Sequence, residues 1–358
     1  MTGSLADLLP GLELETVPVL RQAASAHRYL AELKGVSRTI PNQGILINTL
    51  ALREAKDSSA IENIITSHDE LFKEELFPEQ ATNPAAREVR NYATALKIGF
   101  ELIRGQRLLT CNHIVAIQAE LEKNRAGFRK LPGTVLKNEQ TGQTVFTPPQ
   151  HPEEIVKLMA DLERFINDDS VSAVDPLVKM AIIHHQFESI HPFYYGNGRT
   201  GRIINVLYLV LEGLLDIPVL YLSRYLVQNK AIYYRELQAV RETRLWEPWL
   251  LYMLRGVEET ARQTIQMVEE TTLAIESYKE RIRAAHKFYS QDLIDHLFYH
   301  PYTRIEFLQR ALDVSRLTAT KYLDTLCKDG LLQKEKIGRA SYYINTALFG
   351  ILTQEHNE

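Results

Sequence analysis

Cysteine is scarce in this chain of 358 residues, and its scarcity limits the kinds of site that the chain can form. The two cysteines, Cys111 and Cys327, are far apart and lack the short spacing of a metal-binding pair. A disulfide framework and a cysteine zinc site are therefore excluded. A reducing cytoplasm is the compartment that fits best.

A long uninterrupted apolar run is also missing. The N-terminus lacks the basic start and apolar stretch of a secretory signal. The most apolar segment, residues 203–222, is interrupted by Asn205, Glu212, Asp216 and Pro218. Polar and charged groups are costly inside a bilayer. We therefore expect a buried core helix over this segment and no membrane partner.

Neither sign of charge dominates the composition. The chain has 41 basic and 45 acidic residues and a formal net charge of -4, which does not fit a surface built throughout for nucleic acid. The hydrophobic fraction of 45% and the charged fraction of 24% are close to ordinary globular values. The length predicts two or three domains and is sufficient for a full enzyme core.

The spacing of apolar residues predicts a mainly helical protein with one small β-hairpin. Leu, Ala and Ile recur at three- and four-residue intervals before residue 105, which is typical of packed helices. Residues 127–149 combine Gly, Pro and two short β-prone runs, and they predict a hairpin. The predicted parts are an N-terminal helical region (1–105), a central core (106–257), a connecting helix (258–286) and a C-terminal winged helix-turn-helix domain (287–358).

A twelve-residue segment that starts at His191 combines phosphate-binding groups with a base. Gly196 and Gly198 let the loop turn its amides to one side, where it opens onto a helix N-terminus that favours an anion. Arg199 and Arg202 are three residues apart, so both guanidinium groups can clamp a polyphosphate. His191 can take a proton from an attacking hydroxyl near neutral pH. A lone glycine turn is most often structural, but this combination favours a site.

The segment resembles the signature of the Fic family, HxFx(D/E)GNGRxxR. The resemblance covers roughly residues 45–257 and is strongest to bacterial Fic proteins that carry an added winged-helix domain. It implies a helical Fic core with a hairpin flap, and transfer of AMP from ATP to a Ser, Thr or Tyr hydroxyl of a protein, the chain itself included. The matched residues are His191, Phe193, Gly196, Asn197, Gly198, Arg199 and Arg202.

The resemblance also implies roles for individual residues. His191 is expected to be the base, and residues 135–137 are expected to pair with a strand of the target. Tyr233 and Tyr234 are expected near the adenine, although aromatic residues in a helix are most often core, and both interpretations stay open. The expected phosphate-binding residues are Gly196, Asn197, Gly198, Arg199, Thr200, Gly201 and Arg202, and the expected flap residues are Val135, Leu136 and Lys137.

Tyr195 departs from the family pattern, which has an acidic magnesium ligand at this position. A phenol is uncharged near pH 7 and is a poor ligand for Mg²⁺. Mg²⁺ is still expected to arrive with ATP, held by phosphate oxygens and water, but with weaker affinity. The metal ligand of the protein is therefore unknown. We expect Tyr195 to affect either the transfer activity or its dependence on Mg²⁺.

A second motif lies upstream, at residues 58–63. Ser58, Glu62 and Asn63 match the (S/T)xxxE(G/N) inhibitory motif of one Fic class. The resemblance implies that Glu62 pairs with Arg202, takes the place of the γ-phosphate and leaves ATP in an unproductive pose. Taken alone, the same residues are a helix cap with an acid in the first turn. Together with the phosphate-binding segment they favour autoinhibition.

The predicted winged-helix domain leaves its partner open. Residues 287–345 carry nine basic and seven acidic side chains, too small an excess to demand nucleic acid. DNA and protein are equally good candidates, and a homodimer is a further possibility. The alternatives to an adenylyltransferase are a DNA-binding regulator with a nucleotide-sensing Fic domain and a de-AMPylase. The side chains placed to meet DNA are Ser315, Arg316, Thr318, Thr320, Lys321, Lys334, Lys336 and Arg339.

Overall fold

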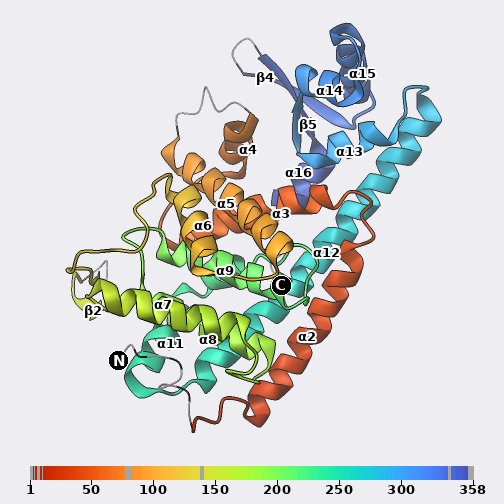
Figure 1. The fold of residues 1–358 in the computed structure, drawn as a ribbon. Helices are drawn as coiled ribbons and strands as arrows, with labels where there is room; N and C mark the ends of the chain where they lie inside the picture. Colours follow the sequence, from red (N-terminus) through yellow and green to blue (C-terminus); the bar gives the residue numbers. More distant parts are fainter. Residues whose placement is uncertain are drawn as a thin grey trace.

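The computed structural model describes residues 11–76, 83–137, 141–337 and 340–353, together with Gly3, Leu5 and Leu9. Helices dominate it, which confirms the predicted mainly helical fold (Figure 1). The elements before the C-terminal unit are α2 (Val17–Ser37), α3 (Gln43–Ile61), α4 (His68–Leu76), α5 (Pro84–Gln106), α6 (Cys111–Glu122), β1 (Leu136–Lys137), β2 (Thr144–Phe146), α7 (Pro152–Asn167), α8 (Pro176–Ile190), α9 (Asn197–Leu211), α10 (Ser223–Gln228), α11 (Lys230–Thr243) and α12 (Glu247–Ala285).

The helices α8 and α9 begin where their sequences signal a start. The Asp175 carboxylate accepts a hydrogen bond from the Leu177 backbone N–H, and Pro176 is the first residue of α8. Gly196 precedes α9 with a φ of 75° and with no side-chain cap. Because α8 and α9 pack against each other, residues 191–196 form a short loop at one end of this helix pair.

The apolar segment 203–222 is not one helix, so the expectation of a single buried helix is wrong. The helix α9 ends at Leu211, and Gly213 follows in the left-handed region with a φ of 69°. Only glycine adopts this conformation easily, and it ends the helix. Leu215, Ile217 and residues 219–222 lie in the same continuous hydrophobic core without being helical, whereas Gly213 and Asp216 are exposed.

The predicted hairpin is present as two very short strands. The antiparallel strands β1 and β2 pair Leu136 with Phe146, and residues 138–140 lie outside the described residues. Gln238 of α11 donates a hydrogen bond from Nε2 to the Val145 carbonyl, at 3.2 Å. The hairpin is therefore attached to α11 as well as to its own chain neighbours.

The helix α12 runs unbroken across residues 257 and 258, where the central core was expected to give way to a connecting helix. It packs along α2 and continues to the C-terminal unit (Figure 1). The division into domains stays a prediction. The sheet of that unit is antiparallel in the order β3-β5-β4. Its elements are α13 (Gln291–Tyr299), β3 (Tyr302–Arg304), α14 (Ile305–Leu312), α15 (Arg316–Lys328), β4 (Leu332–Ile337), β5 (Ala340–Asn345) and α16 (Thr346–Thr353).

The C-terminal unit contacts the chain on both sides of Glu62. Before it, the Asn48 side chain of α3 donates to the Tyr299 carbonyl, at 3.0 Å. After it, the Tyr302 hydroxyl donates to an oxygen of Asp69 in α4, at 2.6 Å. The segment that carries Glu62 is thus held between two helices that are themselves fixed to the C-terminal unit.

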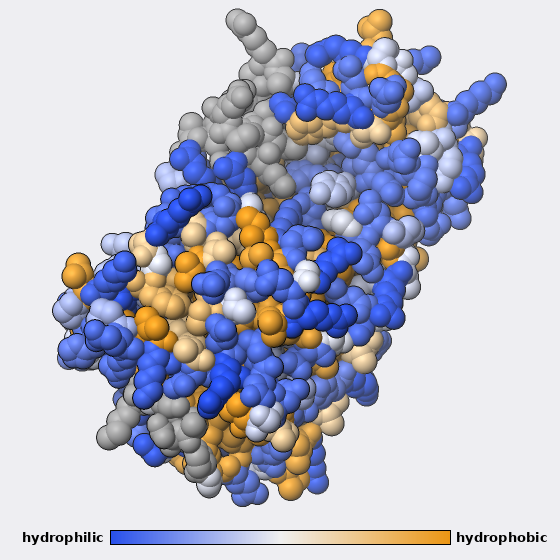
Figure 2. Space-filling view, viewed as in Figure 1, coloured by the Kyte–Doolittle hydropathy of each residue, from blue (hydrophilic) through white to orange (hydrophobic). Residues whose placement is uncertain are grey.

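The surface is mostly hydrophilic on the face in Figure 2, with apolar side chains in separate patches over its lower part. Among the residues that the structure describes, no helix combines the length and apolar character needed to cross a bilayer. Two of the basic side chains expected to meet DNA are paired with carboxylates, Arg316 with Glu306 and Lys334 with Asp324. Arg339, also expected there, lies outside the described residues.

Gly99 provides a test of packing between α5, α6 and α9. A Cβ there would lie 2.6 Å from Leu207 Cδ1 and 2.9 Å from Ile117 Cδ1. Gly99→Val should therefore lower the free energy of unfolding by about 1–3 kcal/mol, because a tightly packed site has no room for the added methyl groups. Urea unfolding measures this value. Gly105→Val, on the same helix with nothing within 4 Å of the new Cβ, is the matched control; equal losses in both variants would contradict the prediction.

Candidate active site

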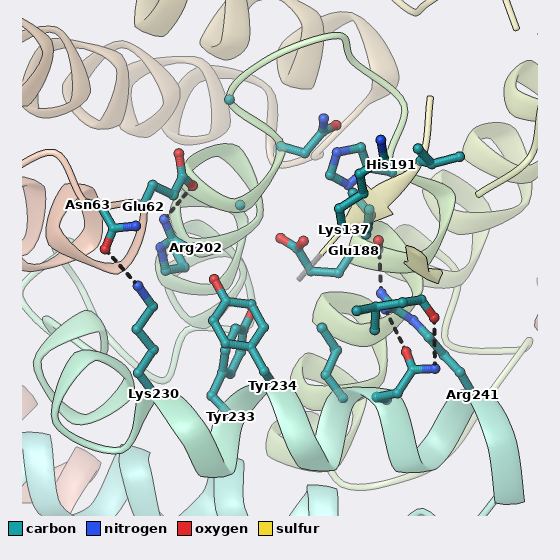
Figure 3. Close-up of a pocket in the computed structure, with 18 of the residues that line it drawn as sticks. Glu62, Asn63, Lys137, Glu188, His191, Arg202, Lys230, Tyr233, Tyr234 and Arg241 are labelled. Atoms are coloured by element: carbon teal, nitrogen blue, oxygen red, sulfur yellow. Dashed lines mark hydrogen bonds and ion pairs between the residues drawn. The ribbon is translucent and has the colours of Figure 1, made fainter. Parts of the chain in front are cut away.

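A cavity of about 980 Å³ opens between the loop that joins α8 to α9, the hairpin and α11 (Figure 3). Its size is in the range of small-molecule sites. Ser58, Arg199, Thr200 and Gly201 do not line it, although the sequence placed them in the site. The predicted residues that do line it are Glu62, Asn63, Val135, Leu136, Lys137, His191, Tyr195, Gly196, Asn197, Gly198, Arg202, Tyr233 and Tyr234.

His191 follows the last turn of α8 in the left-handed conformation, with a φ of 51°. Its backbone N–H donates to the Phe187 carbonyl at 2.9 Å, which fixes the backbone position from which the imidazole side chain projects. The Nδ1 atom is buried and has no hydrogen-bond partner among the described residues. Burial, followed by the charges of Arg129 and Arg241, lowers the pKa of the imidazole to about 4. His191 is therefore neutral near pH 7 and able to accept a proton.

Asn197 holds the loop in shape through its side chain. Its Oδ1 accepts a hydrogen bond from the Phe193 N–H and its Nδ2 donates to the Phe193 carbonyl, both at 2.8 Å. Phe193 is fully buried and packs against the rings of Phe128 and Phe187. The Asn197 side chain, a residue expected to bind phosphate, thus closes the turn, and the uncapped backbone amides at the start of α9 are groups that favour an anion.

The Glu62 carboxylate lies against the glycine turn. A Cβ on Gly198 would lie 2.6 Å from Glu62 Oε1 and 2.9 Å from Arg202 Nη1. Because α9 has no side-chain cap, its N-terminal amides favour a negative group at this place. The carboxylate occupies the position where a phosphate is expected.

Arg202 is buried and is held by the upstream motif. Its Nη2 donates to Glu62 Oε1 at 2.8 Å and to the Ser58 carbonyl at 2.9 Å, and its Nε donates to Ser58 Oγ at 2.7 Å. Burial acts to lower the pKa of the guanidinium, but Glu62, Tyr233, Tyr92 and Glu188 together outweigh burial, and the pKa is raised. The contact between Glu62 and Arg202 that the motif implied is present (Figure 3).

Arg199 is enclosed by three carboxylates. Its Nε, Nη1 and Nη2 donate to Glu62 at 3.0 Å, to Glu88 at 3.1 Å and to Glu122 at 2.7 Å. Its side chain is only 6% exposed. Glu62 therefore bridges both arginines, and Arg199 can reach a phosphate only after these carboxylates are displaced.

Family models match most of the chain. A model described as Fic/DOC family N-terminal matches residues 20–101, and one described as Fic/DOC family matches residues 108–209, together just over half of the chain. The chain belongs to the Fic/DOC family. A third model, described as the C-terminal domain of protein adenylyltransferase SoFic-like proteins, matches residues 274–348.

Similar curated proteins include Fic adenylyltransferases of nematodes and flies. "Protein adenylyltransferase fic-1" of Caenorhabditis briggsae is 32% identical over 120 residues, 34% of this chain and 22% of that protein. "Protein adenylyltransferase Fic" of Drosophila erecta is 29% identical over 112 residues, 31% of this chain and 21% of that protein. The chain thus spans about a fifth of the length of these curated relatives.

Solved Fic structures share the fold of this chain at low sequence identity. A Fic family protein from Desulfovibrio desulfuricans G20 matches with a TM-score of 0.58 and 20% identity, over 92% of this chain and 96% of that chain. Residues 134–508 of Fic-1 from Caenorhabditis elegans match with a TM-score of 0.54 and 21% identity, over 69% and 71% of the two chains.

The two tyrosines of α11 in this Fic chain differ in their surroundings. Tyr233 is buried, and its hydroxyl lies 2.9 Å from His184 Nε2, beside the ring of Trp249. Tyr234 is 47% exposed. Both line the cavity, so Tyr233 is a core residue with one edge at the site, and Tyr234 presents its ring to it.

One face of α11 carries cavity residues that the sequence analysis missed. Lys230, Leu237 and Arg241 line the cavity together with Tyr234. Their three- and four-residue spacing places them on one side of a helix, and that spacing was the available signal. Lys230 Nζ donates to Asn63 Oδ1 at 3.1 Å (Figure 3).

Glu188 was also missed as a cavity residue. It is 7% exposed, and its Oε1 has no hydrogen-bond partner within the described ranges. Burial raises the pKa of its carboxyl to about 7. It lies against the backbone of Gly201, where a Cβ would be 2.9 Å from Oε1, so Gly201 serves close packing between α8 and α9.

The side chains around Tyr195 do not fit a magnesium ion held by the protein. Tyr195 is 70% exposed, and its backbone carbonyl accepts a hydrogen bond from Gln118. The carboxylates nearest the turn, Glu62 and Glu122, are bonded to Arg199. In the described part of the chain, no group of three or more His, Cys, Asp or Glu side chains could hold a metal ion.

The imidazole of His191 should stay neutral at unusually low pH. A folded-state pKa of about 4 lies below the ordinary histidine value of about 6.5, so the ring takes up a proton only as the pH falls through about 4. NMR titration of its ring signals, assigned by their loss in His191→Ala, measures this. The urea-unfolded chain, which should titrate near 6.5, is the reference. A midpoint near 6.5 in the folded protein would show that the ring is open to solvent.

Proposed function

We propose that this chain is a protein adenylyltransferase that moves the AMP part of ATP to a Ser, Thr or Tyr hydroxyl of a protein, itself included. The observation that carries the proposal is a neutral imidazole, His191, at the same cavity as an uncapped helix N-terminus and a buried guanidinium. The similar curated proteins are named as protein adenylyltransferases, which supports it further.

In the proposed reaction, His191 takes the proton of the target hydroxyl as its oxygen bonds to the α-phosphorus of ATP. The bond from that phosphorus to the oxygen bridging to the β-phosphate breaks, and pyrophosphate leaves. The backbone amides after Gly196 and the guanidinium of Arg202 stabilise the charge on the phosphates. Positioning and charge neutralisation are the main contributions in such transfers.

The resting state in this proposal is autoinhibited. Glu62 places a carboxylate against the glycine turn and neutralises Arg202, so the outer phosphates of ATP must compete with it. The two further bonds from Arg202 to Ser58 hold the guanidinium toward the inhibitory segment. Displacing Glu62 is therefore the step that prepares the site.

The partner of the predicted winged-helix domain stays open between DNA and protein. Arg316, on the predicted recognition helix, pairs with Glu306 at the surface. An exposed ion pair of this kind is weak and leaves the side chain able to meet either partner. DNA binding, a homodimer, removal of AMP and a cytoplasmic location stay predictions.

Glu62→Gly should increase self-modification by AMP. A charge-assisted hydrogen bond contributes about 1.5–3 kcal/mol, so its removal should raise the rate about tenfold or more. Intact mass after incubation with ATP and Mg²⁺ counts the AMP groups added. Glu62→Gly combined with His191→Ala should add none, because the base is missing.

Glu88→Gly is the matched control for this test. Glu88 pairs with Arg199 and is 44% exposed, and among the described residues the ion pair of Arg202 is with Glu62. It should leave the rate of self-modification within about twofold of the original protein. The same increase in both variants would argue against a specific restraint at Arg202.

Tyr195→Asp should lower the concentration of Mg²⁺ needed for half-maximal AMP transfer. A carboxylate is a magnesium ligand and an uncharged phenol is not. The requirement is measured in the Glu62→Gly background by varying Mg²⁺ at fixed ATP. Tyr195→Phe removes only the phenol oxygen and should keep the original requirement. An unchanged requirement in Tyr195→Asp would count against this role of the position.

A further inference from the structure

Arg241 is a partly buried cation between the proposed base and the hairpin, and the proposed reaction does not use it. It lies in the last turn of α11. Its Nη2 donates to the Glu188 carbonyl at 3.1 Å and its Nε donates to Ser189 Oγ at 3.0 Å. Both acceptors are in the last turn of α8, just before His191. Arg241 therefore fixes the end of the helix that carries the base.

The same guanidinium contacts the hairpin on its other side. Its Cζ lies 4.0 Å from the centre of the Phe146 ring in β2, which is a cation–π contact. One turn earlier on α11, Gln238 donates to the Val145 carbonyl of the same strand. Figure 3 shows Arg241 at this end of the cavity, where its Nη1 donates to Gln238 Oε1 at 3.4 Å. Two side chains of α11 thus attach β2.

From these contacts, and resting on the proposed function, we propose that Arg241 is a positioning residue. It joins the hairpin to the end of α8, so that a hydroxyl presented by a strand beside β1 is held at the correct place relative to His191. Misplacement of reacting groups by about 1 Å can lower a rate by about a hundredfold. We call the contacts of Arg241 with the end of α8 and with Phe146 the joint. The joint is therefore a determinant of the transfer rate, although Arg241 does not contact the reacting atoms.

The charge of Arg241 also acts on His191. The charged groups that face the imidazole are Arg129 before β1, Arg241 on α11 and Glu62 after α3, and the backbone carbonyl of Glu188 adds its dipole on α8. After burial, the two arginines lower the pKa of His191, whereas Glu62 and the Glu188 carbonyl raise it. Removal of the charge at Arg241 should therefore raise the pKa of His191.

Three substitutions separate the two effects. Arg241→Gln removes both the charge and the planar guanidinium. Arg241→Lys keeps the charge but cannot reproduce the fork of bonds. Phe146→Leu removes the ring on the hairpin and leaves Arg241 in place. All three are made in the full-length chain carrying Glu62→Gly, which serves as the parent for comparison.

The readouts are the NMR titration of His191, hydrogen exchange of the peptide 141–150 that contains β2, and the rate and ATP KM of self-modification. Arg241→Gln should raise the His191 pKa and speed exchange, while Arg241→Lys and Phe146→Leu should speed exchange only. The maximal self-modification rate should fall about tenfold in Arg241→Gln with ATP KM unchanged.

The proposal is overturned if the His191 titration and the hydrogen exchange of peptide 141–150 in Arg241→Gln match those of the parent. It is also overturned if Arg241→Gln changes only the ATP KM, because Arg241 would then be a nucleotide ligand. If Arg241→Gln does not fold, faster exchange in Phe146→Leu and Arg241→Lys at an unchanged His191 pKa supports the joint, and unchanged exchange in both rejects it. Titration and exchange need no AMP transfer. A parent that transfers no AMP therefore refutes the proposed function and leaves the joint testable.

Discussion

The site depends on one electrostatic requirement: two buried guanidinium groups, Arg199 and Arg202, must be neutralised. A buried charge without a partner is costly, so carboxylates occupy the position in the resting molecule. Glu62 reaches both arginines, and Glu88 and Glu122 complete the neutralisation of Arg199. Phosphate oxygens meet the same requirement. In the proposed function, the same two guanidinium groups that would hold the nucleotide phosphates are therefore the groups through which a single glutamate competes with the nucleotide.

The position of Glu62 depends on contacts made by the C-terminal unit as well as on its own motif. Asn48 fixes α3 to the C-terminal unit, and Asp69 fixes α4 to it on the far side of Glu62. Glu62 lies between α3 and α4, and both helices are anchored. It can therefore move away from the glycine turn only if the loop between these helices changes its conformation. The free energy needed to separate Glu62 from Arg199 and Arg202 therefore depends on these anchors as well as on the ion pairs themselves.

Sequence patterns located the main elements of the fold and the residues of the signature. Local signals sufficed for the hairpin and the turn at Gly196, because each depends on nearby residues. The carboxylates around Arg199 could not be predicted, since Glu88 and Glu122 come from two other helices and carry no motif. The end of α9 at Leu211 was missed because the apolar run continues past the left-handed Gly213, into core that is not helical.

The helix α11 connects the two ends of the cavity. At one end Lys230 bonds to Asn63, the neighbour of Glu62, and at the other Arg241 bonds to the end of α8 and stacks on the hairpin. The two ends belong to one continuous helix, α11. In the proposed function, displacement of Glu62 by a nucleotide and alignment of the hairpin with His191 therefore involve the same helix.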